Sequence, residues 1–553
     1  MSATRRYRTQ EAVDFLIIGS GAAGGVMAKE LATAGFRVVV LEQGPYLKPH
    51  EFRHDELGYL FNQELMGPIA EHPQTLRRAE TEEAKVAGPP SPLLYMRAVG
   101  GSSVHFTGNY WRFHPIDFRE HRVWGDIPGA AFADWPITYE ELEPYYTKVD
   151  WEIGVSGAAG VNPFDPPRSR PYPVPPLPVT SAGVLLERGA GTLGLHASPA
   201  PMAILSRPHE GRGACIHCGF CMLFACEAGA KSSTLATMIP RAEATGRCEI
   251  RPDSTVFRIE TSAAGRVTQV LYWDKERQER SQRARAVVLC ANGAETARLL
   301  LLSTSPRFPH GLANGSGKVG KYLMFNGLSY VGALFDEPLN EFKSVEVTRV
   351  IHDFYDADPR RGFYGGGGID ARFGYFPILY GLGGLPPDAP TWGREYKRML
   401  GEYFTRTMYV NGHTTSLPVE TNSISLDPTA KDVFGRPALR VTYQDHPDDL
   451  ATMRFLQARS RELAEAAGAR RIWEYPVTES SLAAHLLGTC RMGTDPAASV
   501  VDPFHRTHEV RNLFICDGSS FVTSGRGQPT MTIQALAFRA AEHIAGFARR
   551  GEI

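Results

Sequence analysis

Residues 14–24 read Asp-Phe-Leu-Ile-Ile-Gly-Ser-Gly-Ala-Ala-Gly, an apolar run that ends in a glycine-rich turn. The run before Gly19 has the length and continuous apolar character of a buried parallel strand. Helix-forming residues follow from residue 25 to residue 34, with Gly35 at the end, and a β-branched strand follows at residues 37–41. The stretch therefore predicts a β-α-β unit of the Rossmann type.

The spacing of the glycines in this turn is that of a dinucleotide-binding site. Gly19 permits a tight turn, Gly21 lets the backbone approach a pyrophosphate, and Gly24 allows close packing of helix on strand. The start of the helix offers free N–H groups to the phosphates. Glu42, at the end of the second strand, is placed to bind ribose hydroxyls and disfavours a 2′-phosphate. We expect a cofactor cradle formed by Gly19, Gly21, Ala22, Ala23, Gly24 and Glu42, although the motif alone does not choose between NAD and FAD.

Composition excludes several classes of partner. Hydrophobic residues make up 43% of the 553 residues and charged residues 22%, as in an ordinary globular protein. The net charge of −1 gives no long-range attraction for nucleic acid or anionic lipid, so we expect no nucleic-acid partner. No apolar run reaches the ~18 residues that a membrane-spanning helix needs. No segment has the apolar core and cleavage site of a secretory signal.

The rest of the chain mixes further α/β segments with an irregular central region. Residues 163–178 contain eight prolines and predict an extended surface connector. Residues 331–440 are rich in aromatic residues, Gly and Pro and predict an irregular sheet region with loops. A buried strand is predicted at residues 285–291, and helices are predicted at residues 294–302, 448–467 and 534–549.

Further motifs occur in a fixed order along the chain. They are VGGSSVHFTGN at 99–109, DWPITYEELEPYY at 134–146, HLLGTCRMG from His485, SVVDP from Ser499, NLFICDGSS from Asn512 and QPTMTIQALA from Gln528. Together they resemble the glucose-methanol-choline (GMC) oxidoreductase family. Within it they are most similar to the branch with gluconate, fructose and glucose dehydrogenase flavin subunits and pyranose 2-oxidase. The resemblance implies FAD, and an FAD-dependent enzyme that oxidises a primary or secondary alcohol of a sugar, glycoside or sugar acid by hydride transfer to flavin.

The resemblance also implies an architecture of two parts. One is a discontinuous α/β Rossmann-type FAD-binding domain, and the other is an α+β substrate domain built on an antiparallel sheet. The FAD-binding domain is expected from residues 8–60, 95–125, 228–330 and 470–553. The substrate domain is expected from residues 61–94, 126–227 and 331–469, with a Cys-rich segment at 213–233.

Two residues are expected to act on the substrate. His485 matches the catalytic histidine of the family, and imidazole suits the role of base for a hydroxyl proton at neutral pH. The partner position is His or Asn in most of the family, whereas this chain has Gln528. An amide cannot act as a base but can hydrogen-bond the substrate oxygen. We interpret the change as a subgroup with different substrate placement; the alternative is an impaired site.

The resemblance adds residues to the flavin site. His105 matches a histidine that is covalently bonded to the flavin in some relatives and only packs near it in others, and both alternatives stay open. Asp517 resembles the residue whose backbone meets the flavin near the pyrophosphate, and Val256 resembles the residue that lines the adenine. The complete set of further cofactor contacts that we expect is Gly100, Gly101, His105, Val256, Asp517, Pro529 and Thr530.

Four of the eight cysteines lie within twelve residues, at Cys215, Cys218, Cys221 and Cys226. The spacing C-x2-C-x2-C-x4-C is close to that of ferredoxins and fits zinc less well. Some relatives carry a similar segment, and glucose and fructose dehydrogenase subunits bind an iron–sulfur cluster through one with different spacing. The resemblance therefore implies a metal site that passes electrons from the flavin to an external acceptor. The alternative is a loop of free or disulfide-bonded thiols.

Several partners and functions follow from these expectations. The substrate would be a small sugar-like molecule, and the partners would include a small subunit, a cytochrome or a quinone acceptor. We expect the protein in the cytoplasm, or in the periplasm after export alongside a signal-bearing partner. One alternative is a sugar oxidase that uses O2, and an alternative of another class is a non-catalytic flavin-binding subunit for electron transfer.

Overall fold

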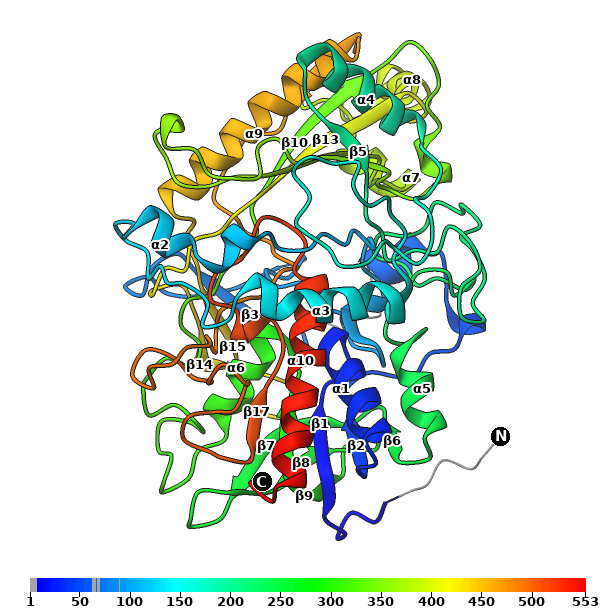
Figure 1. The fold of residues 1–553 in the computed structure, drawn as a ribbon. Coiled ribbons are helices and arrows are strands. Elements are labelled where there is room, and N and C mark those ends of the chain that lie inside the picture. The colour runs from blue at the N-terminus through cyan, green and yellow to red at the C-terminus, as the bar shows by residue number, and fades with distance from the viewer. Residues whose placement is uncertain (1–6, 62–65, 67–69, 89) are drawn as a thin grey trace.

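The computed structural model describes residues 7–61, 66, 70–88 and 90–553 (Figure 1). The residues outside this description include part of the expected substrate segment 61–94. Three sheets organise the described chain. Their positions in the molecule decide where a cofactor and a substrate can meet.

The first sheet contains the predicted β-α-β unit, which the structure confirms. Strand β1 (Val13–Ile18) continues through Gly19 and Gly21 into helix α1 (Ala22–Thr33), and the chain returns in β2 (Val38–Leu41). Strand β1 pairs in parallel with β2 on one side and with β9 on the other. The strand order is β6-β2-β1-β9-β8-β7, with β17 also paired to β9; the bounds are β6 Cys248–Arg251, β7 Thr255–Thr261, β8 Val267–Trp273, β9 Glu279–Leu289 and β17 Leu513–Ile515.

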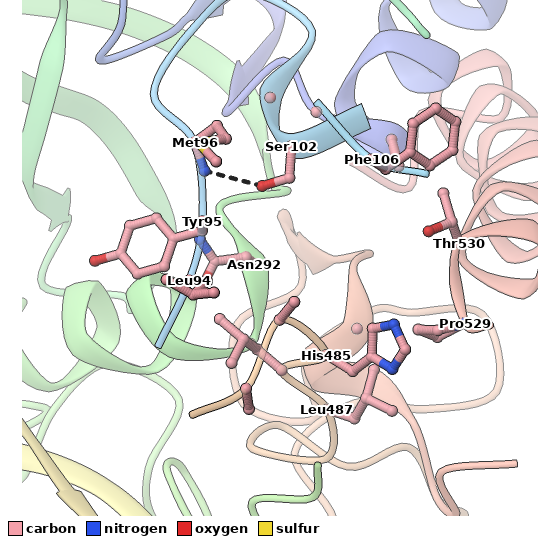
Figure 2. A pocket seen from close by; sticks show the side chains of 18 of the residues that line it. Leu94, Tyr95, Met96, Ser102, Phe106, Asn292, His485, Leu487, Pro529 and Thr530 are labelled. Atoms are coloured by element: carbon pink, nitrogen blue, oxygen red, sulfur yellow. Dashed lines mark hydrogen bonds between the residues drawn. The ribbon is translucent and has the colours of Figure 1, made fainter. Parts of the chain in front are cut away.

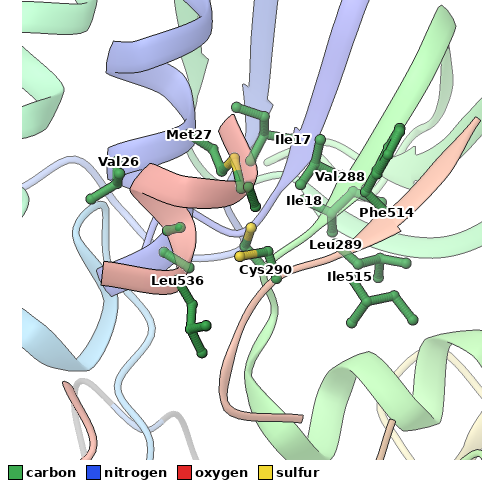
Figure 3. Close-up of a cluster of buried hydrophobic side chains, with 14 of the residues drawn as sticks. Ile17, Ile18, Val26, Met27, Val288, Leu289, Cys290, Phe514, Ile515 and Leu536 are labelled. Carbon is green, nitrogen blue, oxygen red and sulfur yellow. The ribbon is translucent and has the colours of Figure 1, made fainter. Parts of the chain in front are cut away.

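This sheet holds the core of the lower part of the molecule as drawn in Figure 1. The last four residues of its two central strands, 15–18 of β1 and 286–289 of β9, are apolar and buried. Figure 3 shows Ile17 and Val288 on neighbouring strands, with Met27 of α1 and Leu536 of α10 close to them. Helix α10 (Thr530–Arg549) packs against α1 and α3 (Tyr139–Val149), and α5 (Met238–Ala244) packs on the other side of α1.

The second sheet lies in the upper part of Figure 1 and is antiparallel. Helix α9 (Pro447–Ala466) packs against its central strands, and α4 (Ser181–Leu193) packs against α9. The strand order is β16-β10-β13-β12-β11-β5, with β5 Ala197–Pro199, β10 Leu328–Leu334, β11 Arg349–Ile351, β12 Gly367–Arg372, β13 Thr407–Thr414 and β16 Arg471–Glu474. Strand β16 lies just past the expected domain boundary at residue 470, and the two-domain division stays a prediction.

A third, smaller sheet joins segments that are far apart in the sequence. Strand β15 (Pro437–Thr442) pairs with β14 (Ser423–Lys431) on one side and with β3 (Gln74–Arg77) on the other, and β3 pairs with β4 (Lys85–Val86). Helix α6 (Asn292–Leu302) packs against β14 and β15. The third sheet therefore packs against α6, the helix that follows β9 of the first sheet.

The structure corrects one prediction for the central region of the chain, residues 331–440. Residues 331–440 contain sheet strands as predicted, but they also include α7 (Pro377–Gly383) and α8 (Gly393–Tyr403), which the composition did not indicate. Helix α2 (Glu120–Trp124) is short. Residues 163–178 contain neither helix nor strand, as their prolines predict. Among the described residues, the helices are too short or too polar to cross a membrane.

Candidate active site

One large cavity, of ≈ 790 Å³, lies between the first and second sheets. Its lining extends from the glycine turn after β1 to side chains on β10, β12 and β13. Both expected substrate residues, His485 and Gln528, also line it. The cavity therefore connects the dinucleotide-type turn with a second region that is polar enough to hold a substrate.

The glycine turn has the geometry that a pyrophosphate needs. Gly19 has φ +91°, in the left-handed region. A Cβ on Gly24 would lie 1.9 Å from the carbonyl oxygen of Gly19, so helix and strand pack too closely for any side chain there. A Cβ on Gly21 would meet only the Cα of Gly101, at 3.9 Å. Helix α1 begins without a side-chain cap and without an acidic residue in its first turn, so its N–H groups remain for an anion.

A second glycine turn, at Gly100 and Gly101, packs on the first. A Cβ on Gly101 would lie 2.7 Å from the Cα of Gly21, and the N–H of Gly100 donates to the Ser20 hydroxyl at 3.0 Å. Gly101 lines the cavity, whereas Gly100 and Gly24 lie behind its surface. These two glycines therefore support the turn rather than face a ligand.

Glu42 is buried beside this turn. Its Oε2 accepts hydrogen bonds from the backbone N–H and the hydroxyl of Ser20, at 3.0 and 2.8 Å, and its Oε1 accepts from the N–H of Gly44 at 3.0 Å. Burial raises the pKa of Glu42, and these hydrogen bonds oppose the rise. The carboxylate thus fixes the shape of the turn and also lines the cavity.

The other expected cofactor residues come from four separate segments. Ala22, Ala23 and Val256 line the end of the cavity near the first sheet. Asp517 lines it too, and its carboxylate accepts from the Thr296 hydroxyl at 2.6 Å and from the N–H of Ser519 at 2.8 Å. Pro529 and Thr530 form the start of α10, which has no side-chain cap and faces the cavity (Figure 2).

His105 lines the same cavity and is buried. Burial, together with the positive charge of Lys231, lowers the pKa of His105 to about 3, so the imidazole is neutral at pH 7. Its carbonyl accepts a hydrogen bond from the N–H of Leu223 at 2.8 Å. The Cys-rich segment therefore touches the cavity through its backbone.

His485 is held by a residue that the sequence analysis missed. Its Nδ1 lies 2.9 Å from Oδ1 of Asn326. The amide nitrogen of Asn326 donates to the carbonyls of Thr414 and Gly525, at 3.0 and 3.3 Å, which turns the amide oxygen toward His485. An amide oxygen can only accept, so Nδ1 carries the proton and Nε2 carries the lone pair. Figure 2 shows the imidazole beside Pro529.

The protonation state of His485 follows from its surroundings. Burial, with a smaller effect from the neighbouring His413, lowers the pKa of His485 to about 3. The side chain is therefore neutral over the whole physiological range. A neutral imidazole with its lone pair on Nε2 can accept a proton at any pH near 7.

Gln528 lies on a segment that is anchored two residues earlier. Arg526 is completely buried and pairs with Asp117 and with Glu120, the latter at 2.5 Å. The amide nitrogen of Gln528 lies 3.3 Å from Nδ1 of His413 on β13. The segment before α10 is thus tied to the body of the molecule, and its glutamine contacts the opposite sheet.

The face of the second sheet that lines the cavity is charged but internally neutralised. Arg372 and Asp370, both on β12, form a bidentate ion pair, with Arg372 Nε 2.8 Å from Asp370 Oδ1. His413 Nε2 lies 2.8 Å from the other carboxylate oxygen. Asp370, Arg372 and His413 lie outside every motif identified in the sequence, so their place at the cavity could not be predicted from it.

The four clustered cysteines are brought near one another but do not line the cavity. All are free thiols, with Cys221 buried and the other three partly exposed. Burial raises the pKa of Cys215, and the nearby thiols of Cys226 and Cys218 raise it further. Within the described residues, no three His, Cys, Asp or Glu side chains are arranged to hold a metal ion. The expected iron–sulfur site at these four cysteines stays a prediction.

Comparison with known proteins agrees with this geometry. Models of the GMC oxidoreductase family match residues 13–325 and 418–537. The chain is 36% identical to 2-methyl-1,2-propanediol dehydrogenase from Mycolicibacterium austroafricanum, covering 96% of this chain and 95% of that protein. It is 30% identical to the fructose dehydrogenase large subunit from Gluconobacter japonicus, covering 97% and 98%. It is also 30% identical to 6'''-hydroxyparomomycin C oxidase from Streptomyces lividus, covering 96% and 91%.

Solved structures share the fold at low sequence identity. Formate oxidase from Aspergillus oryzae superposes with a TM-score of 0.69 at 15% identity, covering 99% of this chain and 100% of that one. The expected α/β fold with an antiparallel sheet is thereby confirmed, and FAD is the cofactor indicated. The matched family models and the full-length relatives together place this chain in the GMC oxidoreductase family, as an enzyme that acts on alcohol groups.

Proposed function

We propose that this enzyme oxidises one hydroxyl group of a small polyhydroxylated molecule, with His485 as the base that takes the hydroxyl proton. The observation that supports this most is the contact between His485 and Asn326, which leaves the basic Nε2 on a histidine that lines the cavity. The same cavity extends without a break to the glycine turn. A substrate carbon and a dinucleotide cofactor can therefore meet beside one neutral imidazole.

FAD would be held by the residues that form the cradle. The start of α1 at Gly21 and the turn at Gly101 suit the pyrophosphate, Glu42 suits the ribose, and Val256 suits the adenine. When bound there, the flavin supplies the acceptor for a hydride. The chain itself supplies only positioning, proton transfer and exclusion of water.

His485 can do its part although its pKa is low. An alcohol is a weak acid, but its O–H becomes strongly acidic as hydride leaves the carbon, because the product is a protonated carbonyl. A neutral imidazole with its lone pair on Nε2 is then basic enough to take the proton. Asn326 keeps the other nitrogen protonated and holds the ring in place.

The substrate end of the cavity is suited to several hydroxyl groups. Asn109, Ser329, Arg372 and Gln528 all line it and offer donors and acceptors. The charge of Arg372 is balanced by Asp370, so a neutral polyol fits better than a strongly anionic molecule. The relatives are named for a diol, a ketohexose and an aminoglycoside. We therefore propose a diol, sugar or glycoside as the substrate, ahead of the sugar acid that the resemblance also allows.

The fate of the electrons is a separate proposal. The Cys-rich segment borders the cavity through Met222 and Leu223, which supports electron transfer to an external acceptor on this side. The four clustered cysteines stay the expected ligands of an iron–sulfur cluster, and no reaction step is assigned to it. Iron and acid-labile sulfide in anaerobically purified protein would establish a cluster, and their absence with fast reoxidation by O2 would favour the oxidase alternative, which the aminoglycoside oxidase relative supports.

Attachment of the flavin to His105 is a further proposal. It is supported by the neutral, cavity-lining position of that imidazole. Precipitation of the protein with trichloroacetic acid separates the alternatives. A yellow pellet indicates a covalent bond, whereas colour released completely into the supernatant excludes it.

The proposed activity is tested by anaerobic titration of the purified flavoprotein. A panel of 2-methyl-1,2-propanediol, fructose, gluconate and an aminoglycoside is added while the flavin absorbance is followed. We expect at least one of them to bleach the flavin stoichiometrically. A protein that binds FAD but is bleached by dithionite alone would instead be a non-catalytic flavin subunit.

A further inference from the structure

Three polar side chains form a line from the second sheet into the cavity. Asp370 Oδ2 lies 2.8 Å from Nε2 of His413, and Nδ1 of His413 lies 3.3 Å from Nε2 of Gln528. Asp370 is completely buried and His413 is 3% exposed. Both His413 and Gln528 line the cavity. The line therefore connects a buried carboxylate with the glutamine that replaces the usual His or Asn.

The carboxylate determines where His413 carries its proton. Burial by itself raises the pKa of Asp370, but Arg372 and His413 reverse the effect and hold it well below its usual range. An ionised carboxylate only accepts hydrogen bonds, so Nε2 of His413 must donate to it. Arg372 Nη2 also lies near Nε2, at 3.1 Å, but the contact to Asp370 is shorter. On the other side of the ring, Nδ1 faces the amide nitrogen of Gln528, which can only donate, so Nδ1 accepts and the ring proton lies on Nε2.

The tautomer of His413 in turn orients Gln528. A lone pair on Nδ1 attracts the amide nitrogen of Gln528 and would repel its carbonyl oxygen. The NH2 group has two protons, and only one of them is needed for His413. The second proton is then available to an acceptor in the cavity that both side chains line.

We propose that His413 is a positioning residue that turns the NH2 end of Gln528 toward the substrate, so that this amide donates a hydrogen bond to the oxygen being oxidised. This inference rests on the proposed function. A donor at this point binds a lone pair of the hydroxyl oxygen, so that the O–H of the substrate points at His485, and it binds the carbonyl oxygen of the product. The carbonyl end of the amide in the same place would repel that oxygen.

The arrangement also explains why the chain has a glutamine here. Residue 528 lies two positions after Arg526, whose side chain pairs with Asp117 and Glu120. These ion pairs hold the backbone of the segment away from β13. Glutamine is one methylene longer than asparagine, and this extra length lets its amide reach His413. An asparagine at the same place would leave His413 without this contact.

Substitutions at His413 distinguish this role from a structural one. In His413→Asn the amide oxygen can take the position of the imidazole Nδ1. In His413→Gln the longer side chain brings its amide only to the position of Nε2. His413→Asn should therefore keep an acceptor for Gln528, and His413→Gln should keep only the contact to Asp370. His413→Leu has nearly the shape of the Asn variant and keeps neither contact.

The first measurement is the rate of anaerobic flavin reduction by a substrate from the panel. We expect His413→Leu and His413→Gln to slow it about 10–100-fold, with His413→Asn within about fivefold of the unaltered enzyme and substrate affinity little changed in all three. Flavin content and melting temperature check that each variant is folded. Higher activity in the Gln variant than in the Asn variant would overturn the proposal, as would a fully active Leu variant.

The second measurement needs no turnover. Neutron diffraction from deuterium-exchanged crystals of the flavin-bound enzyme locates the protons on His413 and distinguishes the two ends of the Gln528 amide. We expect deuterium on Nε2 of His413. We also expect the deuterated amide nitrogen of Gln528, and not its oxygen, beside Nδ1 of His413. Deuterium on Nδ1, facing the amide oxygen, would overturn the inference even if the enzyme is active. If no alcohol bleaches the flavin, the proposed function fails, and the neutron map still decides the orientation.

Discussion

The glycine turn after β1 and the facing strands β12 and β13 meet the same cavity but are built in different ways. The turn is made by residues close together in the sequence, and its shape depends on the absence of side chains at Gly19 and Gly24. The strands contribute side chains from separate parts of the chain, namely Asp370 and His413. The first region therefore tolerates almost no added atoms, whereas the second depends on the orientation of its polar groups.

Addition of one methyl group to the turn should have the largest effect. In Gly24→Ala the new Cβ would lie 1.9 Å from a backbone oxygen that cannot move aside, so we expect a loss of at least about 3 kcal/mol in unfolding free energy and no flavin-containing protein. Gly21→Ala has room within the protein but points toward the pyrophosphate, so it should fold without flavin. Thermal unfolding and the flavin-to-protein absorbance ratio separate these two results.

A matched control for both variants is Gly191→Ala in α4. Nothing lies within 4 Å of a Cβ at that position. We expect unchanged flavin content and a stability that is at least as high as before, because alanine favours a helix more than glycine does. Normal flavin content in Gly24→Ala would mean that the turn is not packed as described.

Replacement of Asn326 should affect catalysis without affecting the cradle. Asn326→Leu removes the acceptor that keeps the proton on Nδ1 of His485, so part of the molecules would present a protonated Nε2 to the substrate. We expect flavin reduction to slow about 10²-fold, at the low end of the effect of losing a general base, with flavin still bound. Stopped-flow reduction by substrate measures the rate. An unchanged rate would show that Asn326 does not control this tautomer.

Changes at Gln528 should have a moderate effect. Gln528→Ala removes the hydrogen bond to the substrate oxygen, and we expect about a 10-fold lower rate of flavin reduction. Gln528→Asn keeps an amide that is too short to reach His413, so it should retain more activity than the Ala variant while substrate preference shifts. Steady-state kcat and KM across the substrate panel provide the comparison. Two variants with equal and negligible effects would mean that this residue does not face substrate.

A change in the Cys-rich segment should have the smallest effect on the reaction with substrate. Cys218 does not line the cavity, so Cys218→Ser should leave the rate of flavin reduction within about twofold of the original. Reoxidation by ferricyanide, measured in the same preparation, shows whether the segment serves the acceptor reaction. A large loss in the reductive half-reaction would place this thiol in the substrate site, against the described geometry.

The two regions also differed in how far the sequence could predict them. The β-α-β unit and its glycine spacing follow from local rules of strand, turn and helix, so the predicted strand and helix were found close to their predicted bounds. The division into domains and the roles of individual site residues remain predictions. Helix α7 was missed because it contains one proline and two glycines, like the surrounding loops, and α8 was missed because composition alone, and not helical periodicity, underlies the prediction for the whole region.

The substrate side could not be derived in the same way. Asp370 meets His413 because β12 and β13 are neighbours in the second sheet, and Asn326 lies just before β10, which pairs with β13. Strand pairing over such sequence distances leaves no pattern in a single sequence. The histidine at position 413 therefore looked like any other residue of a buried strand until the fold placed it beside Gln528.

The account depends most on a neutral His485 that takes the hydroxyl proton. The most direct test is the rate of flavin reduction by substrate between pH 5 and pH 8, in the unaltered enzyme and in His485→Ala. Because burial lowers the pKa of His485 to about 3, its neutral form persists throughout this range, and we expect a nearly constant rate. The variant should bind flavin and be about 10²–10⁴-fold slower at every pH. A variant as fast as the unaltered enzyme would contradict the account, and so would a His485-dependent rate that falls tenfold per pH unit below about 6.5.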